Sequence, residues 1–481
     1  MNLSDYYAIT PLVFLVCWAI FLLLVDLWIP AGRKGITALL SAAGLLIALV
    51  LVLRSGEQVL TAFEGSVVVD GFSVFLSVLF LVSALAGIAL AHDYLQRLGL
   101  ERGEYYPLLL ISTSGMMLMT YAYDLIEVFL ALELLSIPLY ILAGFSRLNL
   151  ESEEASLKYF LLGAFSSGFV LYGVGLVFAA TGYTDFPGIA KAAQNGSLNP
   201  TLFLIGAGLV LTGFGFKSAL VPFHMWSPDV YQGAPSPVTA FMSVGAKAAG
   251  FAALLRVFVV VFPGMSVNLT PLLWALAALT MFVGNIVALV QSNIKRLLAY
   301  SSIAHSGYLL MAFVPYGNAS VRSDAIAGML FYLAAYCLTT FGAWAVVIAL
   351  EKAEGKGLEL EDYAGLGHRY PFLAATMTIF LLSFTGVPLT LGFWGKFYLF
   401  STAVEGGFWQ LALIGLLTSL ISAYYYLRVV VIMYMRPGTP QVQRNFWPLL
   451  TSGVGALAVV ILGIAPGVLL NLAVSALLKG L

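Results

Sequence analysis

The sequence predicts an all-α protein that crosses a membrane many times, and three properties of the chain support this prediction. Hydrophobic residues make up 61% of the 481 residues and charged residues make up 9%. The mean hydropathy is +0.98. Soluble domains carry about 25% charged residues, so a soluble fold built from this chain would have a mostly apolar surface. Because one membrane-spanning helix needs about 20 apolar residues, the chain can form many such helices.

Apolar runs separated by polar segments predict about fourteen spans. The first seven lie near 8–29, 35–53, 71–91, 105–122, 125–145, 157–181 and 201–230. The other seven lie near 236–262, 271–291, 297–316, 323–350, 371–404, 407–433 and 447–478. The segment Met1–Tyr7 lacks the basic residues of a cleaved signal peptide, so we expect the first span to remain in place.

Two of these runs are too long for one straight crossing and contain an internal proline. The run 201–230 contains Pro222, and the run 371–404 contains Pro388. Proline removes a backbone donor and its ring clashes with the preceding turn, so each helix should break near its proline. Broken helices in lipid are tolerated only where neighbouring groups or water satisfy the freed backbone groups.

The net charge and the cysteines exclude several classes of function. The net charge of −1 gives no reason to expect a nucleic-acid partner. The two cysteines, Cys17 and Cys337, lie far apart in apolar runs. They provide no disulfide framework, zinc site or iron–sulfur ligand set. We therefore expect no cofactor or metal in this chain, and any linked redox chemistry in another subunit.

Basic residues are distributed unevenly between the two sets of loops, with 13 on one side and 4 on the other. The positive-inside rule places the richer side in the cytoplasm and both termini on the outer side. The richer set contains Arg33, Lys34, Arg97, Arg102, Arg147, Lys295, Arg296, Lys352, Lys356, Arg369, Arg428, Arg436 and Arg444. The poorer set contains Arg54, Lys191, Arg322 and Lys479.

The other five of the 22 basic residues fall inside predicted spans, and they are Lys158, Lys217, Lys247, Arg256 and Lys396. A charge at the bilayer centre costs about 2.5–3.5 kcal/mol, and such residues usually mark ion pathways. At a rise of about 1.5 Å per residue, Lys247 lies about 16 Å and Glu133 about 12 Å inside their helices. Lys217 and Lys396 lie close to the two prolines.

Three deep lysines and one glutamate cannot all form ion pairs. The alternative interpretation is that these charges form structural ion pairs that tie helices together. A buried lysine without a counter-charge favours the neutral amine, so it can take up and release protons in a cycle. The excess of lysine over glutamate therefore favours proton transfer.

Histidine titrates near neutral pH, which suits a proton relay. His224 follows Pro222 and His305 lies eight residues into its span, so we expect both to relay protons. A lone buried histidine can also be a core residue with satisfied hydrogen bonds. His92 and His368 are expected in cytoplasmic loops, in contact with solvent.

Lys158 and Arg256 lie nearer the ends of their spans, where a long side chain can reach the interface. Lys158 is a candidate for proton uptake from the cytoplasm, or else it pairs with the acidic segment 151–154. Asp229 follows the first break and is expected at the interface.

Four stretches resemble the antiporter-like proton-translocating subunits of respiratory complex I. They are LALELLSIPLYIL around Glu133, GFKSALVPFHMWSPDVYQGAPSPVTAFMSVGAK at 215–247, NIKRLLAYSSIAHSGYLL at 293–310 and GVPLTLGFWGKFYLF at 386–400. The resemblance covers roughly residues 70–435. The motifs DVYQGAPSPV and GFWGKFY, together with the chain length, favour the N-type branch of this family.

The resemblance implies two inverted five-helix repeats, at about 105–262 and 271–433, each with one broken helix. Three helices in 1–104 precede them and one helix in 434–481 follows. Because five is odd, consecutive repeats have opposite orientations, as in many transporters.

The resemblance also implies roles for the deep charges. Glu133 modulates Lys217, and protons move from the cytoplasm toward Lys247. They then pass by way of His305 and water to Lys396 and leave on the outer side.

The implied function is that of a membrane-arm subunit of a translocase, bacterial NADH:quinone oxidoreductase, in the inner membrane. NADH oxidation and quinone reduction would occur in other membrane-arm and peripheral subunits, which hold FMN, iron–sulfur clusters and quinone. This chain would contact lipid, protons and water. One alternative is a subunit of a multi-subunit cation/proton antiporter, which shares the core motifs. The other, a quinone-binding electron-transfer subunit, is disfavoured because the chain lacks a cofactor ligand set.

Overall fold

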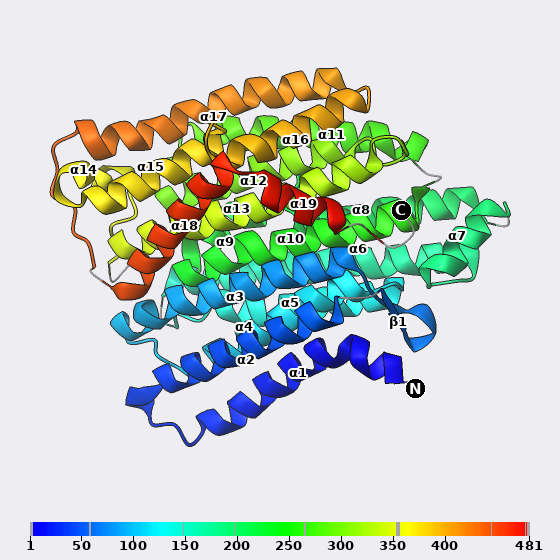
Figure 1. The fold of residues 1–481 in the computed structure, drawn as a ribbon, viewed down its shortest axis with the longest axis horizontal. Coiled ribbons are helices and arrows are strands. Elements are labelled where there is room, and N and C mark those ends of the chain that lie inside the picture. Colours follow the sequence, from blue (N-terminus) through cyan, green and yellow to red (C-terminus); the bar gives the residue numbers. More distant parts are fainter. Residues whose placement is uncertain are drawn as a thin grey trace.

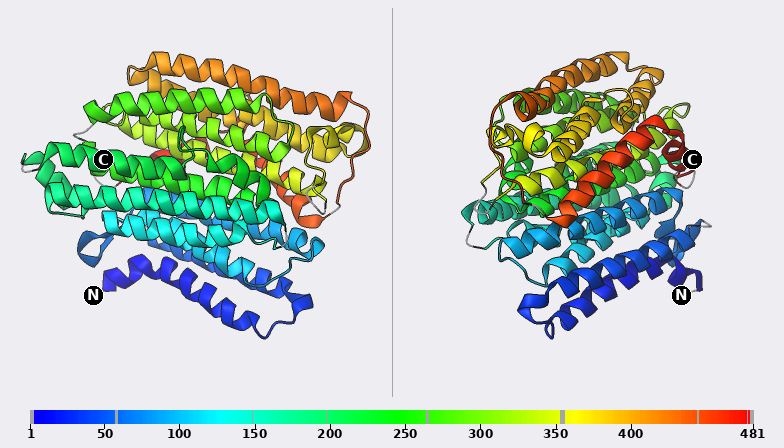
Figure 2. Two further views of the ribbon diagram at one scale, coloured as in Figure 1. Left: turned by 180° about the vertical axis from the view of Figure 1, so that it is seen from behind. Right: turned by 60° about the vertical axis from the view of Figure 1, so that its left-hand side comes forward.

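The computed structural model describes residues 3–56, 59–147, 149–196, 198–263, 266–352, 356–443, 445–476 and 478. Its helices lie side by side and run roughly along one direction in a single bundle (Figures 1 and 2). Two residues of the loop-charge count, Arg444 and Lys479, lie outside the described residues.

The bundle is built almost entirely from α-helices. The first ten are α1 (Leu3–Asp26), α2 (Gly35–Ser55), α3 (Gly71–Arg97), α4 (Tyr105–Tyr121), α5 (Leu125–Ala143), α6 (Leu150–Thr181), α7 (Phe186–Gln194), α8 (Pro200–Lys217), α9 (Trp226–Gly233) and α10 (Ser236–Val260). The next nine are α11 (Ser266–Ala288), α12 (Ile294–Phe313), α13 (Arg322–Leu350), α14 (Leu366–Arg369), α15 (Pro371–Thr385), α16 (Leu391–Glu405), α17 (Trp409–Met435), α18 (Phe446–Ile464) and α19 (Gly467–Ser475). The shorter elements are the antiparallel strands β1 (Leu60–Ala62) and β2 (Val67–Val69) and the 3₁₀ turns η1 (Ala31–Arg33), η2 (Phe63–Gly65) and η5 (Leu360–Tyr363).

The predicted class, an all-α polytopic membrane protein, is confirmed. Among the described residues, 11 helices are long and apolar enough to cross a membrane by length and composition. A further apolar helix, α15, is shorter. The count of about fourteen spans and the two inverted repeats stay predictions.

Two helices form the centre of the bundle. The most apolar window of α10 is 94% buried and that of α13 is 89% buried, whereas that of α1 is 28% buried. Figure 1 shows α10 and α13 in the middle of the bundle, with α1 and α17 at opposite edges. Charged side chains on the central helices therefore lie far from lipid, which explains how the fold accommodates them.

Both proline-containing runs are broken, as predicted. One break separates α8 from α9, and the other separates α15 from α16. At the first break the indole N–H of Trp226 donates to the carbonyl of Phe216 at 2.9 Å, and the N–H of Val221 donates to Oγ1 of Thr280 at 3.0 Å. Neighbouring side chains thus satisfy backbone groups that the break frees.

The last predicted span, 447–478, is wrong as a single helix. It forms two helices, α18 and α19, which are separated at Ala465 and Pro466. Proline cannot continue the hydrogen-bonding pattern of the preceding turn, so Pro466 explains why the helix ends there. The sequence also gave no indication of the β1–β2 hairpin or of α7, and α3 and α6 extend beyond their predicted spans.

Both ends of the described chain lie at one end of the bundle. Asp5 accepts a 3.0 Å hydrogen bond from the N–H of Phe63, beside the hairpin. A Cβ at Gly71, the first residue of α3, would lie 2.9 Å from the carbonyl oxygen of Ser475. Figure 1 shows β1 and α7 at this same end and α14 at the other. The assignment of the termini to the outer side of the membrane stays a prediction.

Candidate functional site

Lys217 ends α8 at the first break, and its ammonium group lies against α5 and α6. It donates hydrogen bonds to Oγ of Ser136 at 2.8 Å and to the hydroxyl of Tyr159 at 3.1 Å. Its Nζ also lies 5.3 Å from the centre of the Tyr159 ring, in cation–π geometry. Glu133 interacts with it electrostatically, but the two described side chains form no ion pair, and Oε1 of Glu133 is buried without a hydrogen-bond partner.

Lys247 lies on the central helix α10 and is 2% exposed. Its ammonium group donates to the backbone carbonyl of Ser302 on α12. Its Nζ lies 5.4 Å from the centre of the Tyr336 ring, and the hydroxyl of Tyr336 donates to Oγ of Ser302 at 2.9 Å. Within the described chain no carboxylate pairs with Lys247, so its buried charge is held by a carbonyl and a ring face.

His305 lies between the two lysines Lys247 and Lys396 and interacts electrostatically with both. One ring nitrogen, Nδ1, is hydrogen-bonded to the hydroxyl of Tyr332 on α13. The other, Nε2, lies 3.2 Å from the hydroxyl of Tyr426 on α17. Because a hydroxyl can donate or accept, both ring nitrogens have a partner through which a proton can pass.

Lys396 lies on α16, close to the second break. Its ammonium group donates to the carbonyl of Thr385 at 3.0 Å and to Oγ of Ser419 at 2.7 Å. Thr385 is the last residue of α15, so the lysine occupies a carbonyl that the break frees. The Nζ also lies 4.8 Å from the centre of the Tyr308 ring.

Three of the predicted residues therefore lie along one buried polar line through the centre of the bundle, although no described hydrogen bond joins His305 directly to either lysine. Lys247 binds Ser302, which precedes His305 by three residues on α12, and residues at this spacing share a helix face. His305 in turn interacts with Lys396. The line connects α10 with α16 across α12.

Lys217 is buried beside this line. Gly250 lies three residues after Lys247 on α10, and a Cβ at Gly250 would lie 2.7 Å from Oγ of Ser218. The glycine thus allows the end of α8 to approach α10 closely. Among the hydrogen bonds of the described residues, none joins Lys217 to Lys247.

Lys158 forms two ion pairs at the surface, with Oε1 of Glu154 at 2.7 Å and with Oδ2 of Asp229 at 2.7 Å. Asp229 also pairs with Arg296 at 2.8 Å. These charges line an open pocket of about 200 Å³. Lys158 thus pairs with Glu154, a residue of the acidic segment 151–154 that was the alternative interpretation. Proton uptake by Lys158 stays a prediction.

Arg256 does not reach the interface, so that expectation is wrong. Its guanidinium binds Asp70 through two hydrogen bonds of 2.7 and 3.1 Å, and both side chains are 1% exposed. Asp70 also caps α3 by accepting from the N–H of Ser73 at 3.0 Å. The start of α3 covers this end of α10, a contact that no local sequence pattern indicates.

Several residues expected in cytoplasmic loops lie inside helices instead, and they are His92, Arg97, Lys295, Arg296, His368, Arg369 and Arg428. His92 belongs to α3, which continues to Arg97, and its Nδ1 lies 3.0 Å from Oδ1 of Asp93. Lys295 belongs to the first turn of α12, is 2% exposed and donates to the carbonyl of Ala234 at 2.7 Å.

The other two histidines differ in environment. His368 is exposed, as expected. His224 is buried beside the first break, and its Nδ1 has no hydrogen-bond partner. No described hydrogen bond joins His224 to a lysine of the site, and its relay role stays a prediction.

Sequence reasoning missed the polar side chains that hold the charged groups. They are Ser136, Tyr159, Ser302, Tyr332, Tyr336, Ser419 and Tyr426. Two had a usable signal, since Ser136 follows Glu133 by three residues and Ser302 precedes His305 by three, which places each pair on one helix face. The tyrosines contact the site from other helices, so no local pattern indicates them.

Known proteins resemble this chain over most of its length. The family described as NADH:quinone oxidoreductase/Mrp antiporter, TM, matches residues 122–422. The NADH-quinone oxidoreductase subunit N of Trichlorobacter lovleyi is 48% identical over 472 residues, which cover 97% of this chain and 95% of the relative.

Two solved structures share the fold. A chain of respiratory complex I from Thermus thermophilus with bound aureothin has a TM-score of 0.83 and 36% identity, and the match covers 96% of this chain and 99% of that chain. A chain of the Mrp complex from Dietzia sp. has a TM-score of 0.87 and covers 99% and 97%, but its 19% identity shows a likeness of fold alone. On the sequence identity of the subunit N relative and on the family match, the chain belongs to the NADH-quinone oxidoreductase subunit N family.

Proposed function

We propose that this chain is a membrane-arm subunit of the translocase NADH:quinone oxidoreductase and that it transfers protons along the line Lys247–His305–Lys396. Membership of the subunit N family supports the first half of the proposal. The observation that carries the second half is the buried polar line, in which carbonyls, hydroxyls and rings hold the basic groups.

The chemistry of this line suits reversible protonation. An ammonium held by a carbonyl and a ring can lose its proton without leaving an unpaired buried carboxylate behind. The carbonyl of Ser302 and the π face of Tyr336 are such partners for Lys247. Protons would move from Lys247 through His305 and water to Lys396. Glu133 would modulate Lys217, which is buried beside this line.

The direction of transfer follows from the proposed orientation. Uptake takes place on the cytoplasmic side and release on the outer side of a bacterial inner membrane, with both termini outside. We propose the repeats at 105–262 and 271–433, with 1–104 before and 434–481 after them. The support is that each proposed repeat contains one broken helix pair with a lysine at or near the break.

Redox chemistry would occur outside this chain. We propose that FMN, the iron–sulfur clusters and quinone belong to partner subunits of the membrane and peripheral arms. The two isolated cysteines of the sequence support this division. Likeness to chains of respiratory complex I supports other subunits of that complex as partners. Lipid would contact the apolar outer faces of α1 and α17.

The test has two parts. A tagged chain purified in mild detergent should bring NADH dehydrogenase subunits with it. Small antiporter subunits in their place would favour the alternative, a cation/proton antiporter. In inverted vesicles, Lys247→Ala should lower NADH-driven proton uptake at least about tenfold, a typical loss when a proton-transfer group is removed. Lys191→Ala, at an exposed lysine of the short helix α7, is the matched control. Parent-level uptake by assembled Lys247→Ala would contradict the proposal.

A further inference from the structure

A buried carboxylate lies at the end of α13 that is remote from the chain termini. Glu351 is the C-cap residue of α13 and is 4% exposed. Its Oε1 accepts a 3.1 Å hydrogen bond from the hydroxyl of Tyr94 on α3. Its Oε2 is buried and has no hydrogen-bond partner. A buried carboxylate with an unsatisfied oxygen is costly to keep, so its presence requires an explanation.

Cations surround this carboxylate without pairing with it. Arg97 on α3 and Lys295 on α12 both interact electrostatically with Glu351. The guanidinium of Arg97 donates to the carbonyl of Ile348, however, with both nitrogens at 3.4 Å, and Lys295 donates to a carbonyl at 2.7 Å. The phenol of Tyr363 on η5 also interacts electrostatically with Glu351. Among the described residues, Glu351 therefore forms no salt bridge.

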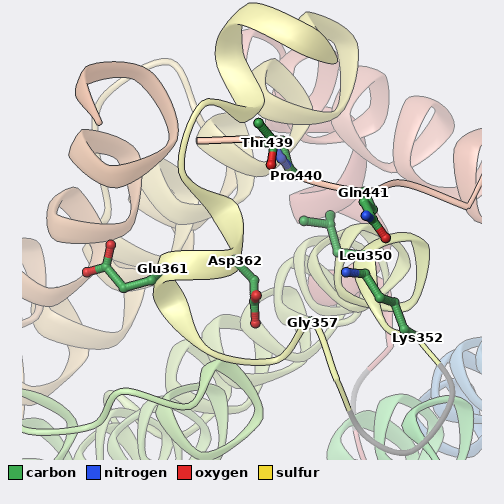
Figure 3. A pocket seen from close by; sticks show the side chains of 8 residues that line it. All are labelled: Leu350, Lys352, Gly357, Glu361, Asp362, Thr439, Pro440 and Gln441. Carbon is green, nitrogen blue, oxygen red and sulfur yellow. The ribbon is translucent and has the colours of Figure 1, made fainter. Parts of the chain in front are cut away.

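A polar pocket opens at the surface beside this group. Leu350 and Lys352, the residues on either side of Glu351, line a pocket of about 160 Å³ (Figure 3). Its other lining residues include Glu361 and Asp362, which are exposed. Bulk water thus reaches the chain at the positions adjacent to Glu351.

On its inner side the carboxylate leads toward the central line. Tyr94 contacts the backbone of Ser236, the first residue of α10, and Oγ of Ser236 is buried without a partner. Tyr231 on α9 interacts with Ser302, whose carbonyl binds Lys247. Tyr94 thus connects Glu351 with the first residue of α10, the helix that carries Lys247, and Tyr231 contacts the serine that binds Lys247.

We propose that Glu351 takes up protons on the cytoplasmic side and passes them through Tyr94 toward Lys247. This inference rests on the proposed function. A proton from bulk water binds the carboxylate and gives a carboxylic acid. The phenol O–H of Tyr94, which donates to Oε1 in the structure, turns away from the protonated acid. The acid O–H bond then breaks as the phenol oxygen accepts its proton, and the phenol O–H bond breaks as a water molecule on the inner side accepts that proton and carries it toward the neutral amine of Lys247. The tyrosine stays neutral and the carboxylate is restored.

This route differs from uptake at Lys158. The ammonium of Lys158 is already bound to two carboxylates, and Asp229 is bound to two cations. Each of these groups is neutralised by its partners at the surface. Glu351, in contrast, has a buried oxygen without a hydrogen-bond partner, and the residues on either side of it line the pocket.

The experiment measures NADH-driven proton uptake by the intact complex in inverted vesicles. Glu351→Gln keeps the shape and an acceptor for Tyr94 but cannot exchange a proton, so uptake should fall about threefold or more. Glu351→Asp keeps the acid in a shorter side chain and should retain most of the rate. A purely structural role predicts the opposite order, because glutamine preserves packing and aspartate does not. Glu104→Gln, at an exposed position on α4's N-terminal side, is the matched control.

Lys247→Ala, measured alongside, separates the two proposals. If Lys247→Ala is impaired while Glu351→Gln takes up protons at the parent rate, the uptake route is wrong and the proposed function stands. If Lys247→Ala is unimpaired, the proposed function fails. Should Glu351→Gln not assemble, Tyr94→Phe removes the next carrier with little change in volume. It should also slow uptake about threefold, and a parent rate in Tyr94→Phe overturns the inference.

Discussion

The ammonium group of Lys217 lies 2.8 Å from the hydroxyl of Ser136, one turn along α5 from Glu133. The lysine is thus held by a neutral group, while Glu133 acts on it electrostatically and keeps a buried oxygen without a partner. On the proposed function, Glu133 would modulate the charge of Lys217 through this electrostatic interaction.

Glu133 and Lys217 should therefore couple energetically. In a double-mutant cycle on the proton uptake rate, Glu133→Gln plus Lys217→Ala should cost less than the sum of the two single changes, by about 0.5–3 kcal/mol of activation free energy. The reason is that each single change already removes the electrostatic interaction. Strict additivity of the two changes would show that the side chains act independently.

Lys217 itself should tolerate neither removal nor replacement by arginine. Lys217→Ala removes the proton-binding group, and Lys217→Arg introduces a guanidinium that stays charged. Both should lower NADH-driven proton uptake in vesicles, and NADH oxidation with it if the two are tightly coupled. Lys191→Ala serves as the control. Normal uptake by fully assembled Lys217→Ala would remove this lysine from the pathway.

The buried pair Asp70–Arg256 should determine stability instead of transport. Removing one partner leaves the other charge buried and unpaired, so Arg256→Leu should destabilise the complex by about 3–5 kcal/mol. Thermal unfolding of the purified complex measures this loss. The double variant Asp70→Leu with Arg256→Leu should recover much of it, because both charges are then absent. A double variant no more stable than Arg256→Leu would mean that the pair does more than neutralise itself.

Local signals in the sequence were sufficient for much of the fold. The breaks at Pro222 and Pro388 were predicted because a proline acts on the turn that precedes it. Pro466 acts in the same way, so the predicted span 447–478 is divided into α18 and α19. The burial of Arg256 had no local signal, since its partner Asp70 lies 186 residues away in the sequence.

The charged residues of the candidate site could be predicted from the sequence, but the side chains that contact them could not. Composition makes each deep lysine conspicuous, because charged residues are rare in this chain. Glu133 was expected to modulate Lys217, but the sequence could not indicate that the hydroxyl of Tyr159, on another helix, also binds the lysine. The partners of His305 likewise come from α13 and α17. Tertiary packing decides such contacts, and a single sequence does not specify it.

The orientation of the chain can be tested by labelling engineered cysteines. A cysteine near Lys356 should react with a membrane-impermeant maleimide only from the cytoplasmic side, and one near Lys191 only from outside. Cys17 is exposed on the protein surface and Cys337 is buried, so both are first replaced by serine to give a silent background. The reverse labelling pattern would overturn the orientation and exchange the sides of proton uptake and release.

The last prediction concerns the release of protons at Lys396. This lysine donates to the carbonyl of Thr385 at 3.0 Å, and Ser419 donates to the same carbonyl at 3.2 Å. In Lys396→Ala, Ser419 still donates to this carbonyl, so the helix break should persist and the complex should assemble. The variant nevertheless lacks the protonatable group.

Lys396→Glu restores a group that exchanges protons, although an ionised carboxylate cannot donate to the carbonyl of Thr385. Proton uptake in vesicles should thus fall in the order parent, Lys396→Glu, Lys396→Ala, with both variants assembled. Ser419→Ala removes a neighbouring donor while keeping the lysine, so it should retain more activity than Lys396→Ala. If Lys396→Ala transported protons as well as the parent, release would have to run through another residue, and the outward half of the proposed path would be wrong.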